Sequence, residues 1–138
     1  MYPQAAAREG EAVDVVRRFF EGINYEYDTD LETKLVGLYR PTCRQCSDAV
    51  IGVHSLHVNG QRTHGGHCHV VRVAQIYPLT NEAVEVRVIL TQDVISVFSA
   101  TGEMTTNYPA IPETMLQFFV KFVNDKPIIL EYTSLGRV

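Results

Sequence analysis

The hydrophobic pattern of this chain changes its period once, at Gly65 and Gly66. Before these glycines, apolar residues recur every three or four positions, as in helices that pack on one face. After them apolar and polar residues alternate, most clearly over residues 82–92, as in strands with one buried face. Helices that precede an antiparallel sheet, instead of alternating with its strands, define an α+β fold. The pattern therefore predicts three N-terminal helices packed on a curved antiparallel sheet of four to six strands.

The helical half of the chain begins with an amphipathic stripe that predicts a first helix over about residues 8–27. The charged residues largely off this stripe are Arg17, Arg18, Glu21 and Glu26. A capping box at Thr29–Glu32 predicts a second, short helix that ends before a proline. A third helix is expected to run to about residue 58, where an Asn-Gly stop signal follows. Thr42 or Ser47 would be its N-cap.

Turn signals divide the second half of the chain into strands. The expected strands cover about residues 67–77, 82–92, 94–100, 116–122 and 128–132. The residues Thr101-Gly102 predict a hairpin turn. Because each strand has one apolar face, we expect the sheet to curve over the first helix. Such a cone leaves a concavity between sheet and helices, which is a common location for small-molecule sites.

Length and charge limit the classes of function. The 138 residues predict one domain, residues 1–138, in which residues 1–7 are expected to be flexible. The net charge of −4, with no compensating basic run, argues against binding to nucleic acid or to an anionic membrane surface. No apolar run approaches the roughly 18 residues that cross a bilayer, so no transmembrane segment is expected.

All three cysteines and all five histidines lie between Cys43 and His69. Cys43 and Cys46 form a C-x-x-C motif, and His54 and His57 an H-x-x-H motif, which together suggest zinc. On one continuous helix, however, Cys43 and His54 would lie about 16 Å apart. Zinc ligands lie only about 2 Å from the ion. We therefore expect no metal in a site made by these four residues, and no cofactor.

Other roles for the C-x-x-C motif stay open. Cys43 and Cys46 could join two of His67, Cys68 and His69 in a zinc site if the first long strand passes the helix start. Two cysteines three positions apart at a helix N-terminus can also close a local disulfide. Alternatively they stay reduced, with Cys46 as a small hydrophobic residue of the core. A thioredoxin-type redox site is not expected, because the motif does not follow a strand.

Three short motifs resemble a family of actinobacterial lipoproteins of unknown function: Asn24-Tyr25-x-Tyr27, Pro41-x-Cys43-x-x-Cys46, and Gly65-Gly66 before the first long strand. More broadly, the order of helices and long final strands resembles the nuclear-transport-factor-two-like superfamily, whose fold is a cystatin-like cone. The narrower resemblance implies a removed lipoprotein signal, an extracytoplasmic domain attached to the membrane only through a lipid anchor, and no assigned activity. The chain carries no lipobox cysteine, so the extracytoplasmic localisation is inferred from this resemblance.

The wider resemblance suggests where chemistry would occur. Enzymes of this superfamily use Asp, His and Tyr side chains that project into the concavity. The pocket candidates of these types are Tyr25, Asp28, Tyr39, His69 and Asp93. Structural roles compete with this interpretation, because Asp28 lies close to a helix cap and Asp93 ends a strand. Cones of this superfamily also often dimerise through the sheet, and Phe119 on the nominally wet face fits such a homodimer.

The leading hypothesis is a non-enzymatic, extracytoplasmic domain that binds a small molecule, a peptide or a protein. The first alternative is an isomerase or hydrolase of the same fold that uses acid–base residues in the concavity. The second alternative is a zinc- or redox-responsive domain built on the cysteine and histidine stretch. The sequence shows no nucleotide-binding, nucleophile-elbow or zinc-protease motif that would name a reaction.

Overall fold

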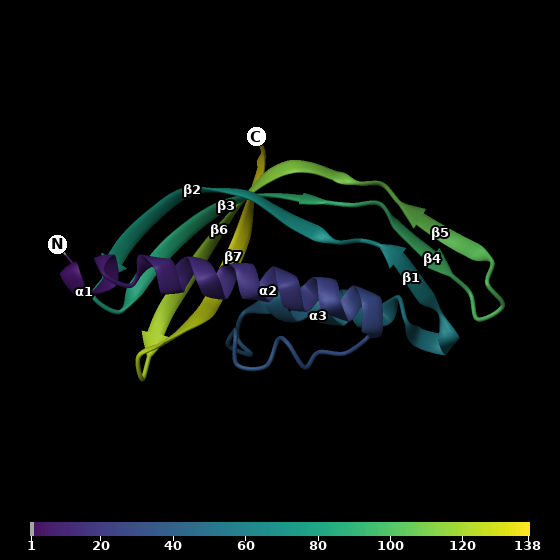
Figure 1. The fold of residues 1–138 in the computed structure, drawn as a ribbon, viewed down its shortest axis with the longest axis horizontal. Helices are drawn as coiled ribbons and strands as arrows, with labels where there is room; N and C mark the ends of the chain where they lie inside the picture. The colour runs from purple at the N-terminus through teal and green to yellow at the C-terminus, as the bar shows by residue number, and fades with distance from the viewer. Residues whose placement is uncertain (1) are drawn as a thin grey trace.

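The computed structural model describes residues 2–138, and in it the helices lie on one side of a bent antiparallel sheet (Figure 1). The helical elements are α1 (Pro3–Ala6), α2 (Glu9–Thr29), α3 (Arg44–Ser55) and the short 3-10 helix η1 (Val58–Gly60). The strands are β1 (Arg62–Gly65), β2 (Cys68–Thr80), β3 (Ala83–Gln92), β4 (Ile95–Phe98), β5 (Met104–Tyr108), β6 (Ile111–Val123) and β7 (Lys126–Arg137). Over the described residues they form a large sheet, β2-β3-β6-β7, and a small sheet, β1-β4-β5. The predicted α+β class is therefore confirmed, but the prediction of one sheet of four to six strands is wrong, because the seven strands of the described chain form two sheets.

The long helix α2 crosses the concave side of the large sheet, and α3 lies beside it (Figure 1). Two neighbouring faces of α2 are buried, since its buried positions recur at three- and four-residue steps. One face packs on the large sheet, where Phe20 meets Phe118 edge to face with ring centroids 5.7 Å apart. Phe19 packs edge to face on Tyr39 and on Tyr132, with ring centroids 5.9 Å apart in each pair. No helix in the described part of the chain has the length and hydrophobicity needed to span a membrane.

The prediction of a second helix after Thr29 is wrong. Thr29 is the last residue of α2. Its hydroxyl donates to the carbonyl of Tyr25 at 2.7 Å and accepts from the N–H of Leu31 at 3.1 Å, but no helix follows before α3. Asp30 then adopts a left-handed conformation with φ of 58°, which ends α2. The following residues form turns, and Gly37 has a φ of 79°, which a helix interior does not contain. The segment is therefore a loop, although its Leu35 is buried.

The third helix is confirmed, but its boundaries differ from the prediction. Neither Thr42 nor Ser47 is its N-cap; Cys43 holds that position, and its sulfur accepts from the backbone N–H of Cys46 at 3.2 Å. The helix ends at Ser55, and the Asn-Gly stop signal forms the 3-10 turn η1. The sequence also did not predict β1 and β5, the two outer strands of the small sheet.

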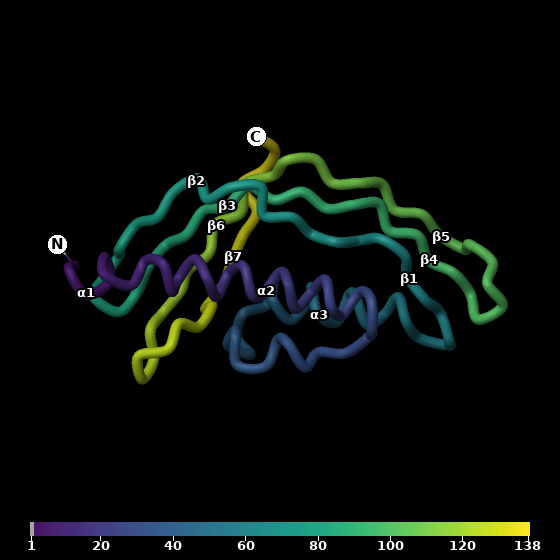
Figure 2. Tube along the Cα trace, viewed as in Figure 1, coloured from purple at the N-terminus to yellow at the C-terminus, as the bar shows by residue number. Residues whose placement is uncertain are grey.

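Three long segments of chain run through both sheets and bend at the same level (Figure 2). These segments are β1–β2, β3–β4 and β5–β6, and they are interrupted at residues 66–67, 93–94 and 109–110. The pairing register aligns the interruptions, because Gly65 pairs with Ile95 before the bend and Cys68 pairs with Gln92 after it. We call residues 66–67, 93–94 and 109–110 together the crease.

The crease depends on Gly65 and Gly66, which have φ values of 81° and 77°. A Cβ atom on Gly65 would lie 2.3 Å from the carbonyl oxygen of Val94 on the neighbouring segment. The Gly66 N–H donates to that same oxygen at 3.0 Å. Such a close approach of two backbones requires glycine. The glycine pair that marks the change of period in the sequence is thus the point where the first segment bends.

The outer face of the large sheet carries a polar cluster. Arg87 donates to Glu85 at 3.3 Å, and Gln117 donates to the same carboxylate oxygen. Phe119 is half-buried on this face, opposite Glu85 in the strand register. Dimerisation through this face stays a prediction.

Candidate ligand-binding cavity

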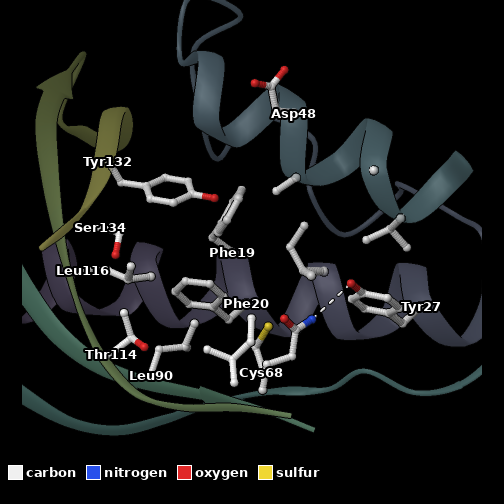
Figure 3. Close-up of a pocket in the computed structure, with 16 residues that line it drawn as sticks. Phe19, Phe20, Tyr27, Asp48, Cys68, Leu90, Thr114, Leu116, Tyr132 and Ser134 are labelled. Carbon is white, nitrogen blue, oxygen red and sulfur yellow. Dashed lines mark hydrogen bonds between the residues drawn. The ribbon is translucent and has the colours of Figure 1, made fainter. Parts of the chain in front are cut away.

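A cavity of about 450 Å³ lies between α2, α3 and the end of the large sheet next to the crease (Figure 3). Its wall combines residues from both helices and from four strands. The lining residues are Phe19, Phe20, Ile23, Tyr27, Asp48, Ala49, Gly52, Val53, Cys68, Leu90, Gln92, Ile111, Thr114, Leu116, Tyr132 and Ser134. A cavity of this size is within the range of small-molecule sites in proteins.

The apolar part of the wall follows directly from the local periodicity of the chain. Phe20, Ile23 and Tyr27 recur at three- and four-residue steps on α2, so they face the sheet together. Leu90 and Leu116 come from inward positions of alternating strands. Aromatic rings and branched aliphatic side chains thus surround the space, which favours an apolar ligand over water.

The polar end of the cavity is built by Tyr27 and Gln92. The side-chain amide of Gln92 donates to the Tyr27 hydroxyl oxygen at 3.0 Å (dashed line in Figure 3). It also donates to the Gly66 carbonyl at 2.9 Å. Both amide hydrogens of Gln92 are thereby used, whereas the Tyr27 hydroxyl accepts and keeps its own hydrogen. The hydroxyl points from its ring toward the interior of the cavity (Figure 3).

The titratable groups inside the wall are held in their neutral forms. Burial, followed by the charge of Asp93, raises the pKa of the Cys68 thiol to about 12. Burial also raises the pKa of Tyr132 to about 12, and it raises the pKa of Tyr27. The carboxylate of Asp48 points out from α3, away from the other labelled side chains (Figure 3). The interior is therefore uncharged at neutral pH.

The five pocket candidates from the sequence lie outside the lining of this cavity, within the described chain. Tyr25 lies beneath Lys34, whose Nζ is 4.2 Å from the ring centroid. Tyr39 packs edge to face on Phe19. His69 lines a smaller cavity of about 240 Å³ between α2 and β2.

The structure pairs the remaining candidates with histidines. His69 Nε2 lies 2.9 Å from Asp93 Oδ2, and His67 Nε2 lies 2.8 Å from Asp28 Oδ1. All four side chains are solvent-exposed. An exposed pair of this kind is a surface ion pair when the histidine is protonated. Only His69 and Asp93, of the five candidates, are thus brought into contact with each other within residues 2–138.

The C-x-x-C motif forms a disulfide between Cys43 and Cys46, with Cα atoms 5.3 Å apart. Both residues are buried at the start of α3. In this oxidised state neither sulfur is a thiolate, the form that binds zinc. Within residues 2–138, Cys68 is the free cysteine, and no group of three metal-ligating side chains is close enough to hold an ion.

Glu26 is a separate polar feature that the sequence did not predict to be buried. It is 0% exposed, and neither carboxylate oxygen has a hydrogen-bond partner in the described structure. It lies on the face of α2 that also carries Gly22, which packs against Leu35 of the loop. Burial, with smaller contributions from Glu32 and Asp30, raises the pKa of Glu26 from 4.5 to about 8.

Sequence reasoning missed the cavity residues for a specific reason. The pocket candidates were Asp, His and Tyr side chains, and they included Tyr25 but not Tyr27, the last residue of the predicted first helix. Tyr27 belongs to the core and to the cavity wall, because its ring is buried and its hydroxyl reaches the cavity. A tyrosine at the end of an apolar stripe, close to the helix C-terminus, is the signal that could have found it.

Together the bent sheet, the crossing helix and the half-open cavity between them define a cystatin-like α+β domain with an apolar site. The sequence matches no known protein family. No curated protein matches it either.

Solved structures support the class of fold. The intermembrane-space region of the chloroplast protein ARC6 is similar with a TM-score of 0.63 and 9% identity, over 93% of this chain and 96% of that one. A protein of unknown function with a cystatin-like fold from Nostoc punctiforme is similar with a TM-score of 0.53 and 9% identity, over 90% of this chain and 86% of that one. An uncharacterised protein with a cystatin-like fold from Caulobacter vibrioides is similar with a TM-score of 0.53 and 10% identity, over 91% of each chain. These identities show a shared fold only, and this confirms the predicted cystatin-like cone.

Proposed function

We propose that this protein is a non-enzymatic binding domain that holds an apolar small molecule in the main cavity. The observation that carries the proposal is the cavity of about 450 Å³ with an apolar wall and an uncharged interior. Proteins bind small molecules mostly in such concave apolar sites with a few polar groups. The apolar wall contributes affinity, since about 25 cal/mol is gained for each Å² of apolar surface removed from water.

The same geometry disfavours acid–base catalysis in the cavity. A general acid or base works best with a pKa near the working pH. Cys68 and Tyr132 have pKa values raised to about 12, far from that range. The His69 and Asp93 pair is exposed to solvent and lies outside the main cavity wall. Binding without chemical conversion is therefore the function that this arrangement supports best.

An extracytoplasmic location is part of the proposal. Stable disulfides form mainly in oxidising compartments, and the Cys43–Cys46 bond favours such a compartment. One structural neighbour is described as coming from an intermembrane space, which agrees with this location but rests on the fold alone. A lipid anchor would follow only if the resemblance to the actinobacterial lipoproteins holds.

The test is a titration with butylbenzene, an apolar probe, followed by amide chemical shifts in NMR spectra. We expect saturable shifts that centre on residues of the cavity wall. Replacing Gly52, which lines the cavity and has open space where a Cβ would lie, by leucine should weaken binding. The matched control is Gly10→Leu, because Gly10 is also helical with open space around it but lies in the first turn of α2.

The proposal fails if butylbenzene produces no saturable shifts of the wall residues. It also fails if Gly52→Leu and Gly10→Leu bind the probe equally well.

A further inference from the structure

We propose that the cavity selects an uncharged ligand whose apolar body ends in a hydroxyl group. This inference rests on the proposed binding function and adds the chemical class of the ligand. Two independent observations carry it: the charges around the cavity and the hydrogen-bonding groups that remain free inside it.

The first observation is that the described wall of the cavity has no cationic side chain. Within the described residues, the wall contains no lysine, arginine or histidine, and Asp48 is its single carboxylate. A ligand carboxylate buried here would meet no positive charge. A buried, unpaired charge is strongly unfavourable. Fatty acids and other anionic amphiphiles are therefore poor ligands for this cavity.

A cationic ligand is disfavoured for a related reason. Its charge would need a buried anion, but the Asp48 carboxylate points away from the cavity (Figure 3). The other titratable groups of the wall, namely Tyr27, Cys68 and Tyr132, have raised pKa values and stay neutral. The wall thus solvates neither sign of charge and favours a neutral ligand.

The second observation concerns the polar end of the cavity. The Tyr27 hydroxyl accepts its hydrogen bond from Gln92, so its own hydrogen is free to donate. The Oε1 atom of Gln92 accepts no hydrogen bond within residues 2–138, whereas both of its amide hydrogens are used. One free donor next to one free acceptor complements a ligand group that both accepts and donates. A hydroxyl is the simplest neutral group of that kind.

The donor and acceptor are also held in place before a ligand binds. Gly66 packs on the Tyr27 ring so closely that a Cβ on Gly66 would lie 2.9 Å from it. The Gly66 carbonyl accepts a hydrogen bond of 2.9 Å from the side-chain amide of Gln92 and so orients that amide. Because the backbone of the crease orients both side chains, little ordering is needed on binding, which increases affinity.

Four probes that share one apolar body test the selectivity. Butylbenzene has no polar group, whereas phenylbutanol, phenylbutanoate and phenylbutylamine each carry one at the end of the chain. We expect phenylbutanol to bind roughly two- to tenfold more tightly than butylbenzene, the net factor of about one hydrogen bond. We expect phenylbutanoate and phenylbutylamine to bind at least about tenfold more weakly than phenylbutanol, because each buries an unpaired charge.

Two variants connect the selectivity to the named groups. Tyr27→Phe should reduce the ratio of phenylbutanol to butylbenzene affinity toward one. Gln92→Leu should do the same and provides a second test if Tyr27→Phe does not fold. Tyr25→Phe is the matched control, because Tyr25 lies outside the cavity wall, and it should keep the ratio of the unchanged protein.

The outcomes separate the two proposals. If butylbenzene binds but all four probes bind equally, the binding function stands and the hydroxyl selectivity is wrong. Preferential binding of the carboxylate or of the amine would also overturn the selectivity. Binding of none of the probes would overturn the proposed function together with this inference.

Discussion

Glu26 gives a quantitative test of the packing between α2 and the loop that follows it. Its side chain is fully buried, and both carboxylate oxygens lack a hydrogen-bond partner in the described structure. Burial, with the nearby charges of Glu32 and Asp30, raises the pKa of Glu26 from 4.5 to about 8, against a smaller opposing effect of His54. Replacing Glu26 by glutamine keeps a polar side chain of similar size but removes the titration.

The sign of the effect follows from proton binding. Between pH 4.5 and about 8, Glu26 keeps its proton in the folded protein and loses it in the unfolded chain. The unfolded state then binds fewer protons, so the free energy of unfolding decreases as the pH rises. Each pH unit costs about 1.4 kcal/mol, which gives about 3 kcal/mol between about pH 5 and about pH 7.5. The Glu26→Gln variant has no carboxyl group at this position, so its free energy of unfolding should not show this decrease.

The assay is urea unfolding of both proteins at several pH values in that window, without reductant so that the Cys43–Cys46 disulfide stays closed. We expect the stability advantage of Glu26→Gln to grow with pH by about 3 kcal/mol. Measurements stay below about pH 8.5, because Cys68 and Tyr132 also have raised pKa values and contribute at higher pH.

Glu21→Gln is the control, because Glu21 lies on the same helix but is exposed. Its stability should follow that of the unchanged protein at every pH. A constant difference between Glu26→Gln and the unchanged protein across the window would refute the reasoning, since it would mean that Glu26 titrates normally in the folded state.

Three further changes test other parts of the fold. Gly66→Ala should destabilise the protein by about 2 kcal/mol in urea unfolding, because Gly66 has a φ of 77° and contacts a ring. Replacing Cys43 and Cys46 by serine should cost about 2 kcal/mol in the same assay, the value expected for a loop this short. Asp30→Asn should lower the pKa of His54 in an NMR titration, because the hydrogen bond and charge of Asp30 raise that pKa.

Each of these changes has its own comparison. Gly37 has a φ of 79° but open space around it, so Gly37→Ala measures the backbone cost without the contact. Equal losses for Gly66→Ala and Gly37→Ala would show that packing at the crease contributes nothing. For the disulfide, adding reductant should destabilise Cys68→Ala and the unchanged protein equally, and unequal effects would argue against the pairing. An unchanged His54 titration in Asp30→Asn would exclude that ion pair in solution.

Local signals predicted those parts of the fold that local energetics determine. The amphipathic stripe of α2 and the alternation of β3 and β6 appear in the sequence because one face of each element is buried. The loop after Thr29 was predicted wrongly, because a capping box is a local preference and tertiary packing overrode it. Leu35 packs against Gly22 of α2, where a Cβ would come within 2.6 Å of it. Because Leu35 packs there, the segment after Thr29 lies against α2 as a loop and does not form a second helix.

The two strands that were not predicted lack the pattern on which strand prediction depends. Every residue of β5 is exposed, so its sequence has no alternation between buried and wet positions. β1 has the sequence Arg-Thr-His-Gly, which contains no apolar residue that could show a period. Both strands exist because β4 pairs with them on either side, and such pairing between distant segments is not visible in local sequence.

The cavity could not be predicted because its volume depends on where the long strands bend. The interruptions at residues 66–67, 93–94 and 109–110 look like unrelated turns along the sequence, and only the pairing register places them on one line. Gly66 on that line contacts the Tyr27 ring and binds the Gln92 amide. The polar end of the cavity is therefore at the crease because the crease supplies the backbone that orients it. The glycine pair that separates the two periods of the sequence thus also fixes the position of the candidate hydroxyl site.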